Sequence, residues 1–145
     1  MVHVVVVTHG RFGEELLKAA EMIVGEINGV DNVSLLKEDN PLSFEEKIRR
    51  VLWEKEEELL FLADIYGGTP CNTAVSILKS YPAWIVTGVN LAMLLEVATT
   101  FEEVSQAKEM AENLMNISAS SCQILNRNTM KVEFEEEGIP EGDDL

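Results

Sequence analysis

Residues 2–13 read Val2-His3-Val4-Val5-Val6-Val7-Thr8-His9-Gly10-Arg11-Phe12-Gly13. Four consecutive valines are typical of a strand that is buried on both faces, as strands of parallel sheets are. The run stops at Thr8-His9-Gly10, and a helical pattern of apolar residues begins at about Glu14. We therefore expect His9 where a parallel strand passes into a helix. In open α/β sheets, ligands bind at that carboxyl edge.

Buried strands and amphipathic helices alternate along the rest of the chain. Strands are expected at about 2–8, 32–37, 59–64 and 83–87, and helices at about 14–27, 43–57, 70–80, 91–99 and 101–115. Ser43, with Glu46 three residues later, is typical of a capping box at a helix start. Thr69 before Pro70 has the pattern of an N-cap followed by a first helical residue. The alternation predicts an α/β fold with a doubly wound, mostly parallel central sheet and helices on both faces.

Length and composition indicate one domain. The 145 residues are 46% hydrophobic, enough for a single packed core, which we expect over residues 1–137. Residues 138–145 are acidic and contain glycine and proline, as frayed tails often do. The two cysteines, Cys71 and Cys122, have no metal-ligand spacing and form no disulfide framework. No signal peptide and no apolar run of about 20 residues is present, so a cytoplasmic location is expected.

Charge and motifs exclude several function classes. The formal net charge of −15 argues against nucleic-acid binding, which requires a basic face. It is consistent either with simple solubility or with attraction to a basic partner. The sequence contains no Walker A motif, no dinucleotide-binding glycine motif, no metal-ligand cluster and no Gly-x-Ser-x-Gly elbow. We therefore expect neither a metal nor another cofactor.

Small and polar residues follow three of the predicted strands, at Thr8–Gly10, Asp64–Asn72 and Thr87–Asn90. A neutral imidazole at His9 could attack phosphorus, and Asp64 could hold one ring nitrogen if the two strands are neighbours. Gly67-Gly68-Thr69 precedes a helix start, where backbone N–H groups form an anion site. Structural explanations remain open: a lone histidine is often structural, an aspartate after a strand often caps a turn, and Gly-Gly-Thr-Pro is also an ordinary turn.

Three motifs together resemble the EIIA component of the mannose family of the bacterial phosphoenolpyruvate-dependent sugar phosphotransferase system (PTS). They are Thr8-His9-Gly10 after an apolar strand, Leu60–Asn72, and Thr87–Leu94. The resemblance covers about residues 1–125. It implies that His9 accepts a phosphoryl group on Nε2 from the carrier HPr and passes it to a histidine of EIIB, which serves the membrane components EIIC and EIID. It also implies that Asp64 orients His9 through Nδ1.

The resemblance assigns further residues and an assembly. Gly67, Gly68 and Thr69 are expected to bind the phosphoryl group. A set of nearby residues is expected to contact partners or support the site: Thr8, Gly10, Asn72, Asn90 and Met93. The family forms homodimers with an exchanged C-terminal strand, for which Ser121–Leu125 is the first candidate and Met130–Phe134 the second. Ala92 departs from the family, which often has proline there, but this motif shapes a helix start.

Three alternative functions remain. The chain could be a regulatory module whose phosphohistidine is detected by a partner protein. It could be the phosphotransfer subunit of a dihydroxyacetone kinase, which shares the fold and the histidine, although Gly-Gly-Thr-Pro and Gly-Val-Asn favour the sugar-transport group. It could also be a flavodoxin-like domain that binds a small anion without covalent chemistry.

Overall fold

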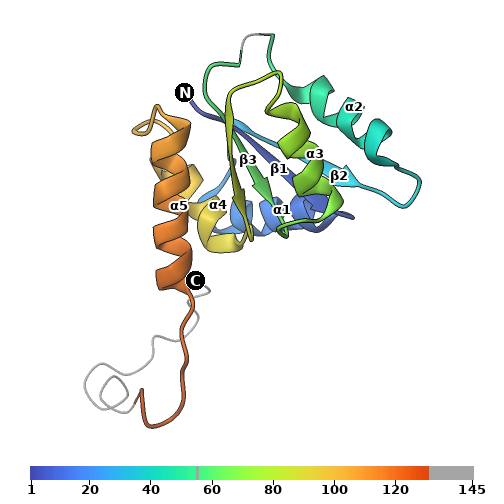
Figure 1. The fold of residues 1–145 in the computed structure, drawn as a ribbon. Helices are drawn as coiled ribbons and strands as arrows, with labels where there is room; N and C mark the ends of the chain where they lie inside the picture. The colour runs from blue at the N-terminus through green and yellow to red at the C-terminus, as the bar shows by residue number, and fades with distance from the viewer. Residues whose placement is uncertain (55, 131–145) are drawn as a thin grey trace.

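The computed structural model describes residues 1–54 and 56–130. Over these residues the central sheet has four strands, all parallel. Its strands are β1 (His3–His9), β2 (Val30–Leu35), β3 (Leu59–Ala63) and β4 (Ala83–Thr87). They are ordered β2-β1-β3-β4 (Figure 1). β1 therefore lies beside β3, with Val7 opposite Ala63, as the predicted pairing of the His9 and Asp64 strand ends requires.

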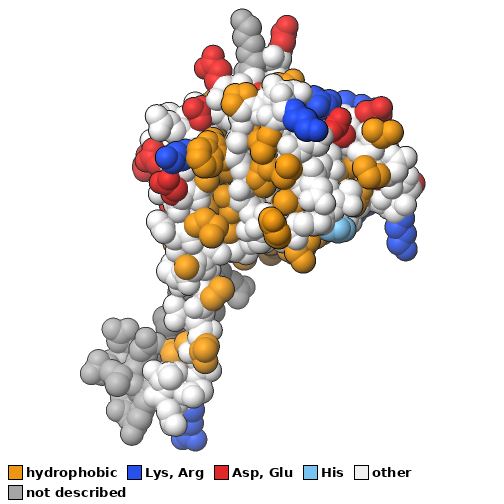
Figure 2. Space-filling view, viewed as in Figure 1, with side chains coloured by type: hydrophobic (Ala, Val, Ile, Leu, Met, Phe, Trp, Pro, Cys, Tyr) orange, Lys and Arg blue, Asp and Glu red, His pale blue; other side chains and the backbone are white. Residues whose placement is uncertain are grey.

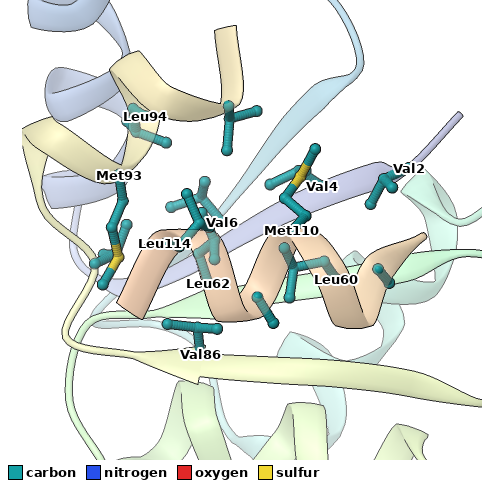
Figure 3. Close-up of a cluster of buried hydrophobic side chains, with 14 of the residues drawn as sticks. Val2, Val4, Val6, Leu60, Leu62, Val86, Met93, Leu94, Met110 and Leu114 are labelled. Carbon is teal, nitrogen blue, oxygen red and sulfur yellow. The ribbon is translucent and has the colours of Figure 1, made fainter. Parts of the chain in front are cut away.

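Helices cover both faces of the sheet, which confirms the predicted α/β architecture. The first core contains Val4 and Val6 of β1 and packs under α1 (Phe12–Val24), α4 (Leu91–Thr100) and α5 (Ala107–Ser121). Figure 3 shows this core where α4 and α5 meet the sheet. The second core contains Val5 and Val7 and packs under α2 (Pro41–Val51) and α3 (Thr69–Ile77). Alternate valines thus face opposite layers, which explains the unbroken apolar run.

The predicted start of the second helix is wrong by several residues. Asn40, not Ser43, is the N-cap of α2: its side chain accepts the Ser43 N–H at 2.9 Å, and the Ser43 hydroxyl accepts the Asn40 N–H. Ser43 thus occupies the N3 position of the capping box rather than the N-cap position. Pro41 explains the shift, because proline is favoured in the first helical turn.

The second helix also ends earlier than predicted, at Val51, because a buried histidine holds the chain that follows. The ring of Trp53 stacks on that of His3 with centroids 4.1 Å apart. The two ring nitrogens of His3 lie 2.7 Å from carboxylate oxygens of Glu56 and Asp31. His3 is fully buried, so this cluster fixes the connection to β3 at the edge of the sheet opposite His9.

Other helix ends also shift. The first helix ends at Val24, where Gly25 has φ +84°, rather than near residue 27. The fifth runs over Ala107–Ser121 instead of about 101–115, so Ser121 is helical and not part of a strand. Residues 122–126 are exposed and carry no strand pairing within the described chain. The second candidate strand, Met130–Phe134, and the expected tail 138–145 lie outside the described residues except for Met130.

Across residues 1–54 and 56–130, no helix is both long enough and apolar enough to cross a membrane.

Candidate functional site

His9 and Asp64 meet at the carboxyl edge of the two central strands. Asp64 Oδ2 accepts the His9 backbone N–H at 2.8 Å and lies 2.8 Å from His9 Nδ1. Asp64 Oδ1 accepts the Ile65 N–H at 2.9 Å, so both carboxylate oxygens are held. The predicted pairing of these two side chains is thus present in the structure.

The Asp64 contact fixes which nitrogen of His9 is free. An ionised carboxylate only accepts hydrogen bonds, so Nδ1 carries the proton and Nε2 keeps its lone pair. The His9 side chain is 52% exposed, whereas that of Asp64 is 13% exposed. The site therefore combines a half-exposed imidazole, whose Nε2 has a free lone pair, with a largely buried carboxylate.

The turn after β1 is fixed by Thr8 and Gly10. Thr8 is fully buried, and its hydroxyl accepts the Gly13 N–H at 2.9 Å, which connects the strand to the start of α1. Gly10 has φ +55°, a left-handed conformation that favours glycine. Its N–H donates to Leu35 O at 2.7 Å. Both predicted residues thus support the backbone that carries His9.

The loop from β3 to α3 surrounds the other side of the imidazole. Gly68, not Thr69, is the N-cap of α3, because Thr69 already belongs to the helix and precedes Pro70 within its first turn. Asn72 closes the loop: its N–H donates to Gly68 O at 2.9 Å, and its side-chain amide donates to Gly67 O at 3.1 Å. Pro70 has no N–H, and within the described chain the N–H groups of the first helical turn have no helical acceptor. Such N–H groups are suited to an anion, which is the role that the sequence predicts for this loop.

The third polar strand end lies beside α5. Asn90 is the N-cap of α4, accepts the Met93 N–H at 3.1 Å and donates to the Ser118 hydroxyl at 2.8 Å. Met93 is only 1% exposed and lies in the core (Figure 3). Of the two roles expected for Met93, its burial excludes direct partner contact and leaves support of the α4 packing.

Exposed apolar side chains on the segments next to the site were not identified from the sequence. Tyr66 is 84% exposed and Ile65 58% exposed, directly after Asp64. Phe12, three residues after His9, is 49% exposed, and Leu42 at the start of α2 is 76% exposed. The sequence offered one signal for them: these apolar residues lie in loops and first helical turns, outside the periodic apolar pattern that marks a buried face. Ile65 and His9 both lie within 3.5 Å of a Cβ placed on Gly68, and Leu42 lines a shallow pocket with Thr69 and Asn72. We call Phe12, Leu42, Ile65 and Tyr66 the apolar rim.

A charged cluster also stabilises the β2–α2 connection. The hydrogen bond from the Lys47 ammonium, at 2.8 Å, holds the pKa of Asp39 below its usual value, and the Leu36 N–H assists. Lys47 also donates to Ser34 O at 2.7 Å. Among the described residues, no cluster of histidine, cysteine or acidic side chains has a metal-binding arrangement.

The fold and the site define a doubly wound α/β protein with an aspartate-oriented, surface histidine beside a helix N-terminus. Residues 3–115 match the model of the EIIA-man family, described as the PTS system fructose IIA component. The chain belongs to this family of sugar phosphotransferase-system EIIA components.

Individual relatives agree with the family match. The chain is 36% identical over 135 residues to the PTS system fructose-specific EIIA component of Bacillus subtilis, covering 91% of this chain and 92% of that protein. It is 35% identical over 96 residues to the PTS system mannose-specific EIIAB component of Escherichia coli, covering 64% of this chain and 30% of the longer relative. The mannose/sorbose-specific IIA subunit from Enterococcus faecalis superposes with a TM-score of 0.80 at 35% identity, covering 86% and 95% of the two chains.

Proposed function

We propose that this protein is a phosphocarrier of the sugar phosphotransferase system, in which His9 accepts a phosphoryl group from HPr and passes it to a histidine of EIIB. One observation supports the assignment most strongly: Asp64 holds Nδ1 of a half-exposed histidine, which leaves Nε2 free. The relay supplies the sugar-phosphorylating uptake of the membrane components EIIC and EIID. Both transfers take place in the cytoplasm under this proposal.

Neither His9 nor Asp64 gains or loses a proton during the transfer. The Nε2 lone pair of His9 bonds to phosphorus as the bond between phosphorus and HPr breaks. The ring gains positive charge, Nδ1 keeps its proton, and the Asp64 carboxylate stabilises the resulting cation. Backbone N–H groups of Gly68 and Thr69 are suited to the phosphoryl oxygens. In the second transfer, an EIIB imidazole attacks phosphorus and the bond to Nε2 breaks, which restores the starting tautomer.

The surroundings of His9 favour a protein partner over a small ligand. The apolar rim of Phe12, Leu42, Ile65 and Tyr66 offers aromatic and aliphatic contacts, which are enriched in interface cores. Most acidic side chains visible in Figure 2 lie away from the lower edge of the α/β body, where a histidine reaches the surface. His9 is the exposed histidine, since His3 is buried. We assign this face to HPr and EIIB in turn.

A homodimer is also part of the proposal. β4 is an edge strand of the described sheet, and Figure 2 shows hydrophobic side chains gathered over it. A cavity of about 270 Å³ lies between β4 and α5, lined in part by Trp84 and Met115. After α5 the chain exposes Ile124 by 92% and Leu125 by 64%. A second copy could add this segment to the open edge as a further strand.

Solution mass measurements of the full chain test the dimer. We expect Ile124→Asp to dissociate it, because an acidic side chain would face the apolar groove. Met22→Asp is a matched control on α1, since Met22 is similarly exposed, at 88%. A wild-type monomer, or a dimer that Ile124→Asp leaves intact, would contradict strand exchange through this segment.

Phosphorylation is tested by intact mass after incubation with phosphoenolpyruvate, Enzyme I and HPr. Wild-type protein should gain one acid-labile phosphoryl group, and His9→Ala none. Subsequent addition of EIIB should remove the group. Retention of the group in the presence of EIIB would favour the regulatory alternative, and no gain while HPr itself is phosphorylated would refute the carrier assignment.

A further inference from the structure

The imidazole of His9 lies directly against Gly68. A Cβ atom placed on Gly68 with ideal geometry would lie 2.8 Å from His9 Cε1 and 3.4 Å from Nε2. Carbon atoms in ordinary contact are about 3.5–4.0 Å apart. The histidine ring therefore occupies the volume that any side chain at position 68 would need.

The backbone at this position does not itself require glycine. Gly68 has φ −77° and ψ 168°, an extended conformation that all residues adopt. Its neighbour Gly67 shows the reverse: φ is +82°, but no atom lies within 4 Å of an added Cβ. The two glycines are thus required for different reasons, Gly67 for its conformation and Gly68 for the space beside it.

We propose that Gly68 is a positioning residue for His9: its missing side chain lets the ring lie against Gly68 while Nδ1 contacts the Asp64 carboxylate and Nε2 stays free. The ring is confined because Asp64 Oδ2 holds Nδ1 at 2.8 Å while Gly68 borders the adjacent Cε1 atom. An added Cβ has little room on its other side, where Ile65 Cγ2 would be 3.1 Å away.

The consequence follows from the rigidity of the imidazole. Relieving the contact requires Cε1 to move by about 0.7 Å, the difference between 2.8 Å and an ordinary contact. Nδ1 is bonded to Cε1 and moves with it, which disturbs its 2.8 Å contact with Asp64 Oδ2. Because the side chain is 52% exposed, the ring can turn outward without disturbing the core. The fold should tolerate a Cβ at position 68, whereas the orientation of His9 should not.

The expected effect on phosphoryl transfer rests on the proposed function. Misplacement of a reacting group by about 1 Å can reduce a rate by about 100-fold. We therefore expect Gly68→Ala to slow phosphorylation by HPr by about 10- to 100-fold, with a melting temperature close to that of wild type. Gly68→Ser provides a second variant, since serine adds the same Cβ but is a better helix N-cap than alanine.

The test is ¹⁵N NMR of the His9 ring in the unphosphorylated full chain, together with melting temperature and transfer rate. Wild type should show the tautomer protonated on Nδ1. Gly68→Ala and Gly68→Ser should lose that single tautomer, as Asp64→Asn should. Gly67→Ala should keep the tautomer but melt at a lower temperature, because alanine is strained at positive φ.

The outcomes separate this proposal from the proposed function. If both Gly68 variants keep the wild-type tautomer, the positioning role is refuted, even if their transfer rates fall. If the tautomer is lost as expected but wild-type protein accepts no phosphoryl group, the positioning role stands and the carrier function is refuted.

Discussion

Replacement of Asp64 by asparagine tests how the site activates His9. The carboxylate accepts three hydrogen bonds: two from His9, through its N–H and Nδ1, and one from the Ile65 N–H. An asparagine keeps one accepting oxygen and presents an NH₂ group in place of the other. If the asparagine oxygen faces His9, its NH₂ group faces the Ile65 N–H, so two donors meet without an acceptor. If its NH₂ faces His9, Nδ1 must accept and the proton moves to Nε2, which removes the nucleophilic lone pair.

The size of the effect follows from the charge that is lost. A hydrogen bond to a charged group contributes about 1.5–3 kcal/mol, and each 1.4 kcal/mol corresponds to a factor of ten in rate. We therefore expect Asp64→Asn to slow phosphoryl transfer by about 10- to 100-fold. The exposure of His9, at 52%, places the effect toward the lower end, because solvent partly screens the ring charge.

Rapid-quench measurement of transfer from phosphorylated HPr provides the assay. Asp39→Asn is the matched control: Asp39 also caps a turn and accepts backbone and side-chain donors, but among the described residues its hydrogen bonds do not include His9. The control should transfer at the wild-type rate. An Asp64→Asn protein that transfers within about two-fold of wild type while folded would refute the orienting role.

Three further predictions concern stability. His3→Leu leaves the buried Glu56 and the Asp31 carboxylate without their shared partner, so urea unfolding should show a loss of about 3–5 kcal/mol; a loss below about 1 kcal/mol would contradict the role of the cluster. Gly13→Ala places a Cβ 2.9 Å from a buried β1 valine and should cost about 1–3 kcal/mol in the same assay, whereas unchanged stability would show that α1 shifts freely. The lowered pKa of Asp39 means that its stabilising contribution is present at neutral pH and is lost as pH falls below about 4 through the folded-state pKa, so wild type should lose melting temperature more steeply than Asp39→Asn there; parallel profiles would contradict this.

The sheet and the pairing of His9 with Asp64 could be predicted from the sequence, because the patterns that indicate them are local. The valines of β1 and the apolar run of β3 are buried however the helices pack in detail. Parallel pairing of the two strands then places the residues that follow them at one edge of the sheet. His9 and Asp64 were therefore identifiable together. The ends of α2 and α5 could not be identified in this way. The early end of α2, for example, depends on Trp53 packing against His3, which is far away in the sequence.

Details of the site also depended on three-dimensional contacts. Gly68 was expected to bind a phosphoryl group, but its contact with the His9 ring has no sequence signal, because a glycine before a helix is explained equally well by the turn. The exposure of Tyr66 likewise depends on how the loop leaves β3. Residue types indicated the chemistry, whereas the contacts around them required the folded chain.

The proposed carrier function depends on one atom, Nε2 of His9. The most direct measurement is ¹⁵N and ³¹P NMR of the full chain after phosphorylation by phosphoenolpyruvate, Enzyme I and HPr. We predict a single phosphohistidine, with phosphorus on Nε2 of His9 and a proton retained on Nδ1 beside Asp64. Phosphorus on Nδ1, on another residue, or absent while HPr is phosphorylated would contradict the proposed mechanism.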